Sequence, residues 1–182
     1  MTNAAVFFDR DGTLMEEAGY CSDPALVRVY PGVPEALGRL REAGFRLILV
    51  TNQSGIARGY FTEREYRAVE AEFLRQIAPA WLDASYFCAD GPGAARRKPE
   101  PAMVLEAAEE FGIDLASSYF VGDKASDIEC GRRAGVTTVL VKTGYGSRAV
   151  CEPDFTAENL VSAVELILGM VGMVGQAVSP AS

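Results

Sequence analysis

Histidine is absent from the 182-residue sequence, and this absence excludes several classes of catalysis. Ser-His-Asp and Cys-His active sites, phosphohistidine chemistry and histidine-ligated metal sites all require an imidazole. Cysteine is scarce as well, because the chain holds four and no two of them form a C-x-x-C pair. A chain of this length with so few cysteines is not expected to depend on a disulfide framework.

Long apolar runs and an excess of positive charge are also lacking. The N-terminus has no basic segment before its short apolar run, and the apolar stretch at residues 163–175 is interrupted by Glu165 and by glycines. A membrane span needs about 20 apolar residues, so we expect neither a signal peptide nor a transmembrane helix. Lys and Arg total 17 against 25 Asp and Glu, a net charge of −8 that opposes binding to nucleic acid or to an acidic membrane. We therefore predict a cytoplasmic monomer whose partner is a small molecule, with no nucleic-acid or membrane partner.

Short apolar runs alternate with amphipathic helical segments along the chain. The expected strands cover residues 4–8, 45–50, 84–88, 118–121 and 137–142. Helices are expected between them, where apolar residues recur with helical spacing, and a last helix is expected over residues 157–170. This alternation predicts an α/β protein with a Rossmann-like three-layer fold around a central, mostly parallel sheet. We expect one domain over residues 1–182, in which residues 170–182 form a frayed tail.

Acidic side chains follow two of the expected strands. Asp9 and Asp11 come after the first strand, with Gly12 behind them, and Asp123 comes after the fourth. Ligands bind at the carboxyl ends of parallel strands, so these carboxylates would meet in one crevice and repel one another unless a cation such as Mg²⁺ lies between them. Asp9 could then attack phosphorus, while Asp11 donates a proton to the leaving oxygen and later activates water. A plain turn after a strand is the alternative interpretation of the first pair alone.

Polar and basic residues that suit a phosphate group follow other strands. Thr51-Asn52 ends the second strand and offers a hydroxyl and backbone N–H groups, although such a pair alone is more often a cap or a turn. Lys98 precedes Pro99 and therefore lies on a loop, where its ammonium could offset the charge of a phosphoryl group. The alternative is that the Arg96-Arg97-Lys98 run is simply a solvated basic segment.

A second acid follows Asp123 about one helical turn later, at Asp127. A helix N-cap formed by Asp123 is the alternative to a metal ligand there, and a residue can hardly fill both roles. Asp127 is expected to position Asp123, its loop or a metal-bound water.

Four segments, in this order, resemble the four motifs of the haloacid-dehalogenase-like phosphatases. They are F-D-R-D-G-T-L at residues 8–14, T-N-Q-S-G at 51–55, R-K-P at 97–99 and V-G-D-K-x-x-D at 121–127. The segment at 51–62 is similar, more specifically, to the heptose bisphosphate phosphatases and their histidinol-phosphatase relatives, which lack a large cap domain.

The resemblance implies a role for each matching residue. Asp9 would be the nucleophile that forms an aspartyl-phosphate, and Asp11 the general acid and base. Mg²⁺ would be held by the Asp9 side chain, the Asp11 backbone carbonyl and Asp123. Thr51 and Lys98 would hold the transferring phosphate.

Further positions match the substrate or metal pocket of the branch. These are Asn52, Arg97 and Lys124, and Arg58 is a candidate for the remote end of the substrate. The branch commonly carries a zinc loop with several cysteines and a histidine before the R-K-P motif. Here residues 88–96 hold a single cysteine, Cys88, which cannot build a four-ligand site, so we predict that zinc is absent.

The implied function is Mg²⁺-dependent removal of the 7-phosphate from D-glycero-D-manno-heptose 1,7-bisphosphate. Histidinol phosphate and other small sugar phosphates are alternative substrates. A phospho-acceptor signalling domain would also place acids, a threonine and a lysine at strand ends, but Asp11 adds proton transfer and therefore turnover. A non-catalytic relative is a third interpretation, although every catalytic position is filled. The apolar residues at 166–173 could form a partner surface, but such a stripe more often packs a last helix on the sheet.

Overall fold

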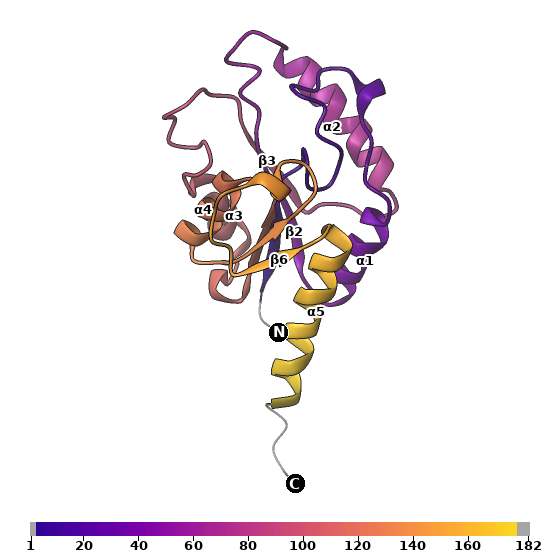
Figure 1. The fold of residues 1–182 in the computed structure, drawn as a ribbon, viewed down its shortest axis with the longest axis vertical. Helices are drawn as coiled ribbons and strands as arrows, with labels where there is room; N and C mark the ends of the chain where they lie inside the picture. The colour runs from indigo at the N-terminus through magenta and orange to yellow at the C-terminus, as the bar shows by residue number, and fades with distance from the viewer. Residues whose placement is uncertain (1–2, 178–182) are drawn as a thin grey trace.

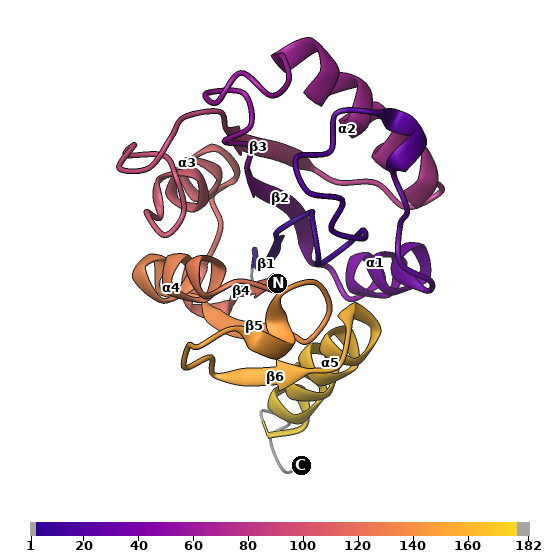
Figure 2. The ribbon, with the colours of Figure 1, turned by 45° about the horizontal axis from the view of Figure 1, so that its top comes forward.

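The computed structural model describes residues 3–177, which form one six-stranded parallel sheet covered by helices (Figures 1 and 2). The strand order is β3-β2-β1-β4-β5-β6. The strands are β1 (Ala5–Phe8), β2 (Arg46–Asn52), β3 (Ala84–Cys88), β4 (Tyr119–Gly122), β5 (Thr137–Val141) and β6 (Phe155–Ala157). All five predicted strands are therefore present, and the predicted Rossmann-like three-layer architecture is confirmed.

Two layers of helices cover the two faces of the sheet. The helices are α1 (Val33–Glu42), α2 (Glu63–Ile77), α3 (Ala102–Phe111), α4 (Ala125–Ala134) and α5 (Leu160–Ala177). Side chains of α1, α2 and α5 pack with one face of β1, β2 and β4, and those of α3 and α4 pack with the other (Figure 2). Among the described residues the connections hold only short 3₁₀ turns, and no large cap domain is present.

The C-terminal part of the fold differs from the sequence-based prediction. Residues 155–157 form the short edge strand β6, which pairs with β5, so the helix begins at Leu160 rather than at 157. Three residues are too few to display strand alternation, and Phe155 and Thr156 are exposed. Helix α5 continues to Ala177, past residue 170, although its glycines disfavour a helix. Residues 178–182 of the expected tail lie outside the described residues.

The central strand β1 positions the first acidic motif of the chain. All four residues of β1 are fully buried between β2 and β4, with Val6 and Phe8 facing one helical layer and Ala5 and Phe7 the other. The chain leaves β1 where the strand order runs in opposite directions on its two sides, the position at which open parallel sheets bind ligands. The next residue, Asp9, therefore lies at the centre of this edge.

Candidate active site

A buried lysine links two carboxylates at the carboxyl edge of the sheet. Lys98 Nζ lies 2.9 Å from Asp9 Oδ1 and 2.7 Å from Asp127 Oδ1, and it donates a hydrogen bond of 2.7 Å to the carbonyl oxygen of Val50. Although burial alone lowers the pKa of Lys98, the charges of Asp127 and Asp9 raise it above its usual value. Burial would raise the pKa of Asp9, but Lys98 and Lys124 hold it below its usual value. The pair is therefore ionised, and Lys98 does not belong to a solvated basic run.

Asp123 follows β4 and is fully buried. Its Oδ2 accepts a hydrogen bond of 2.8 Å from the backbone N–H of Tyr145, and Thr13 Oγ1 lies 3.4 Å from its Oδ1. Burial and the charge of Asp9 raise the pKa of Asp123 to about 7. The carboxylates of Asp9 and Asp123 repel each other, and a cation bound between them would offset this repulsion.

The start of helix α4 shows how Asp123, which precedes the helix, and Asp127, in its first turn, are used. The N-cap position is Lys124, whose backbone N–H donates to Asp127 Oδ2 at 3.0 Å. Asp123 is therefore not the helix cap, and its carboxylate faces the site instead. Because Asp127 binds the Lys124 backbone with one oxygen and Lys98 with the other, it positions both neighbours.

The oxygen atoms gathered here fit a hard divalent cation. Carboxylate oxygens of Asp9, Asp123 and Asp127 lie within 4.8 Å of one another. The ammonium of Lys124 already lies among the predicted ligands, 3.4 Å from the Asp11 carbonyl oxygen, 3.8 Å from Asp9 Oδ2 and 4.0 Å from Asp123 Oδ1. The site thus attracts positive charge, and its ligands are the oxygens that Mg²⁺ prefers.

Two glycines allow the backbone to pack against Asp123. Gly12 has φ +88° and Gly144 has φ +54°, a region that side chains rarely adopt. A Cβ at either position would lie well under 3.0 Å from Asp123 Oδ2. The carboxylate is therefore held in a cradle that other residues would obstruct.

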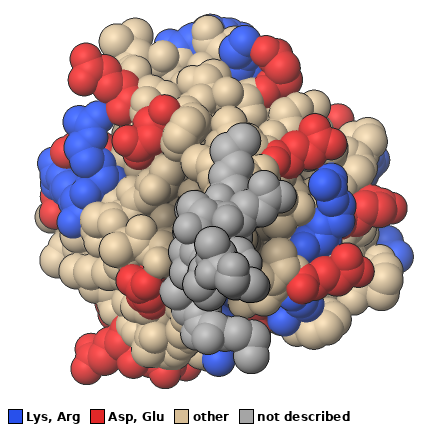
Figure 3. All heavy atoms as spheres, turned by 90° about the horizontal axis from the view of Figure 1, so that it is seen from below, with Lys and Arg blue, Asp and Glu red and all other residues tan. Residues whose placement is uncertain are grey.

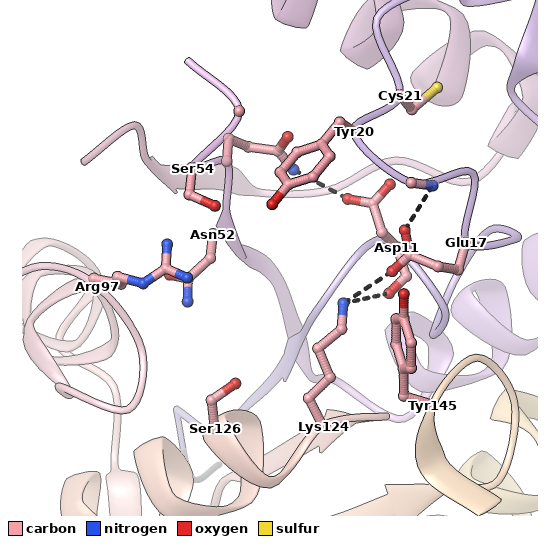
Figure 4. Close-up of a pocket in the computed structure, with 13 residues that line it drawn as sticks. Asp11, Glu17, Tyr20, Cys21, Asn52, Ser54, Arg97, Lys124, Ser126 and Tyr145 are labelled. Carbon is pink, nitrogen blue, oxygen red and sulfur yellow. Dashed lines mark hydrogen bonds and ion pairs between the residues drawn. The ribbon is translucent and has the colours of Figure 1, made fainter. Parts of the chain in front are cut away.

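The carboxyl of Asp11 faces an open cavity beside this cluster (Figure 4). Gln53 Nε2 donates to Asp11 Oδ2 at 3.0 Å and to Thr51 Oγ1 at 2.9 Å. Arg10 Nη2 lies 3.1 Å from both oxygens of Asp11. Thr51, at the end of β2, is buried close to the same groups.

The cavity measures about 330 Å³, and its rim comes from several loops. Arg97 and Lys124 extend into it from two sides, and Tyr20, Tyr145 and Asn52 also line it (Figure 4). Positive side chains thus face the open cavity next to Asp11.

Asn52 and Arg58, two of the predicted substrate contacts, interact with other parts of the protein in the structure. Both ends of the Asn52 amide bind the backbone of Lys98, at 3.0 Å each, so Asn52 fixes the Lys98 loop as well as lining the cavity. Arg58 does not line the cavity, and its guanidinium lies 6.0 Å from the ring centre of Tyr20. Its place is therefore outside the rim.

Sequence reasoning missed several residues of the site. Arg10 and Gln53 lie inside recognised motifs, but nothing in their spacing indicated contact with Asp11. Tyr20 and Tyr145 lie on loops that reach the site only in the folded chain.

No helix in residues 3–177 has the length and apolar character that a membrane crossing requires.

Comparisons with known proteins identify the family of the chain. A family model described as "Haloacid dehalogenase-like hydrolase" matches residues 6–73, and a second HAD-like hydrolase model matches residues 95–163. A D-glycero-D-manno-heptose-1,7-bisphosphate 7-phosphatase of Thermosynechococcus vestitus is 40% identical over 92% of this chain and 96% of its own. A D-glycero-beta-D-manno-heptose-1,7-bisphosphate 7-phosphatase of Yersinia pestis is 41% identical over 77% of this chain and 81% of its own.

A solved structure is similar over the same extent. The D,D-heptose 1,7-bisphosphate phosphatase from B. bronchiseptica, complexed with magnesium and phosphate, superposes with a TM-score of 0.86 at 32% identity, over 92% of this chain and 99% of its own. The family models, the identities and the superposition agree, and the chain belongs to the haloacid-dehalogenase-like phosphatases, in the branch of the heptose bisphosphate phosphatases.

Proposed function

We propose that the protein is a Mg²⁺-dependent phosphomonoesterase that works through an aspartyl-phosphate on Asp9. The observation that carries this proposal is the pairing of a buried, ionised Asp9 with Lys98, next to an Asp11 carboxyl that faces the cavity. An ionised carboxylate is a competent nucleophile, and a neighbouring carboxyl can move the proton.

The residues would divide two steps between them. In the first, an Asp9 oxygen forms a bond to phosphorus, the bond to the bridging oxygen breaks, and Asp11 gives its proton to the departing alcohol. In the second, Asp11 takes a proton from water as the water oxygen bonds to phosphorus and the Asp9 O–P bond breaks, which releases phosphate, returns Asp9 as a carboxylate and leaves Asp11 protonated. Lys98 and Thr51 would offset the charge of the phosphoryl oxygens. When bound, Mg²⁺ would be held by Asp9, Asp123 and the Asp11 carbonyl and would reduce repulsion between Asp9 and the phosphate.

The proposed substrate is D-glycero-D-manno-heptose 1,7-bisphosphate, with the 7-phosphate as the group removed. The names of the relatives support this substrate, and so do the basic side chains of Arg97 and Lys124 in the cavity. Arg97 and Lys124 could bind a second phosphate, whereas histidinol phosphate carries an ammonium at its remote end, which two cations would repel. Arg58 remains a candidate for contact with a substrate that projects past Tyr20.

A phosphate-release panel tests the proposal. It compares both anomers of the heptose bisphosphate, histidinol phosphate and common sugar phosphates, with and without Mg²⁺. We expect the highest kcat/KM for a heptose bisphosphate and no turnover in a chelator. Asp9→Asn should lower kcat by at least about 10⁴-fold with an unchanged circular dichroism spectrum, because the nucleophile is lost.

Other outcomes would decide against particular parts of the proposal. Full activity of Asp9→Asn would rule out the aspartyl-phosphate. A preference for histidinol phosphate would overturn the substrate assignment. A long-lived phosphoaspartate without phosphate release would favour the signalling function.

A further inference from the structure

Gln53 is fixed between two groups of the proposed reaction. Its side chain is buried, and Nε2 donates to Asp11 Oδ2 at 3.0 Å and to Thr51 Oγ1 at 2.9 Å. An amide nitrogen carries two hydrogens, so both are in use. The backbone N–H of Gln53 also donates to the carbonyl oxygen of Cys88 at 2.7 Å, which anchors the residue to the end of β3.

Arg10 approaches the same carboxyl. Its side chain is fully buried, and Nη2 lies 3.1 Å from both oxygens of Asp11. The guanidinium lies 5.3 Å from the ring centre of Tyr66, and within the described chain Nε and Nη1 have no hydrogen-bond partner. Burying a charge is costly unless a partner compensates it, and Asp11 is the ion partner that the described residues provide. The guanidinium of Arg10 is thus oriented toward the Asp11 carboxyl.

The geometry points to Gln53 and Arg10 as positioning residues that hold the Asp11 carboxyl in the orientation required for proton transfer. This inference rests on the proposed function, in which Asp11 protonates the leaving oxygen. A well-placed acid contributes about 10²–10⁴-fold to a rate, and a misplacement of about 1 Å can cost about 10²-fold. Loss of the clamp should therefore slow phosphoryl transfer to Asp9 when the leaving oxygen needs the proton, and spare this transfer when it does not. The second step, in which Asp11 acts as the base, is common to both kinds of substrate.

Two substrates of similar size separate these effects. The alkoxide of benzyl phosphate is a strongly basic leaving group that needs the proton, whereas 4-nitrophenolate leaves without much help. We would measure kcat and KM for both compounds with Mg²⁺, because kcat/KM reports the phosphoryl transfer to Asp9. In Gln53→Met, which keeps size and removes both hydrogen bonds, kcat/KM for benzyl phosphate should fall about 10- to 100-fold. For 4-nitrophenyl phosphate we expect kcat/KM to change by less than about 3-fold. For benzyl phosphate the loss should lie in kcat rather than in KM.

Matched variants separate failure of the inference from failure of the proposed function. Asp11→Asn should show the same selectivity with a larger loss, and equal losses on both substrates would instead refute the acid role of Asp11. Gln76→Met makes the same exchange at a glutamine outside the cavity, whose side chain donates to the Val27 carbonyl oxygen and to Glu72, and it should leave the ratio between the two substrates unchanged. If Asp11→Asn is selective but Gln53→Met slows both substrates equally, the clamp is refuted.

Arg10 gives a second, graded comparison. Arg10→Lys keeps the charge but replaces the guanidinium by a single ammonium, so its selective loss should be smaller than that of Arg10→Met. If Arg10→Met fails to fold, the lysine variant and Gln53→Met still test the clamp. A wild-type substrate ratio in a folded Arg10→Met together with a selective loss in Gln53→Met would limit the positioning role to Gln53.

Discussion

At the scale of single residues, the carboxyl of Asp123 couples the site to pH. Burial and the charge of Asp9 raise its pKa from 3.8 to about 7. Between these values the folded protein binds this proton more tightly than the unfolded chain does. The contribution of Asp123 to the free energy of unfolding is thus fully present below about pH 4 and is lost as pH rises through about 7. A cation beside the carboxylate would oppose that loss.

Magnesium binding should therefore displace a proton from this carboxyl. We expect the affinity for Mg²⁺ to rise about tenfold per pH unit between pH 5 and 7 and to level off above, with about one proton released below pH 7. Isothermal titration calorimetry in two buffers of different ionisation enthalpy measures both quantities. An affinity that does not change between pH 5 and 7 would contradict the raised pKa.

Strand-end reasoning located the acidic residues of the site but not their neighbours. Asp9 and Asp123 each follow a buried strand, and parallel strands bring such residues together from any distance along the chain. Arg10, between two acids in the sequence, instead suggests an exposed turn, yet it is fully buried beside Tyr66. Contacts of this kind depend on packing between elements that lie far apart in the chain, and local sequence patterns do not reveal them.

At the scale of elements, the loops around Asp123 depend on glycine. Gly12→Ala should lower kcat by about 10²-fold or more, because the added Cβ would displace Asp123. Gly44→Ala is a matched control, since Gly44 has φ +90° and open space around it, so it bears the same backbone strain of about 1–3 kcal/mol without the clash. Steady-state kinetics and thermal unfolding of both variants provide the test. Equal activity in the two variants would show that the close approach of Gly12 to Asp123 does not limit catalysis.

The elements themselves were predictable where their patterns were long. Helix α2 begins at a capping box, in which the Thr62 hydroxyl accepts a hydrogen bond from the backbone N–H of Glu65, and its helically spaced apolar residues from Tyr66 to Ile77 are buried. Strand β6 was missed because its stability comes from pairing with β5 rather than from local sequence. Helix α5 was placed three residues early for the same reason.

At the scale of the whole molecule, side-chain and backbone contacts hold the loop after β3, and we predict that this loop binds no zinc. Arg96 makes two contacts with Glu106 of α3, at 2.9 and 2.7 Å, and the backbone N–H of Ala57 donates to Ala89. We expect elemental analysis of the purified protein to find no stoichiometric zinc, and a zinc chelator to leave the Tm unchanged. Glu106→Gln should cost at most about 1 kcal/mol, because the pair is exposed. One zinc per chain would refute this account.

Charge on the molecular surface bears on the partners we expect. On the face that carries the end of α5, acidic and basic side chains are interspersed rather than gathered into one basic patch (Figure 3). The net charge of −8 is the basis on which we predict that no nucleic acid is a partner.

The residues proposed for the chemistry are buried, whereas residues at the rim of the cavity are exposed. Asp9 and Lys98 are 3% exposed, whereas Tyr20 and Tyr145 are 48% and 47% exposed. Substitutions at exposed positions usually change stability by less than about 0.5 kcal/mol. Descendants of this chain could therefore acquire new metabolite preferences through rim mutations while inheriting the reaction itself intact.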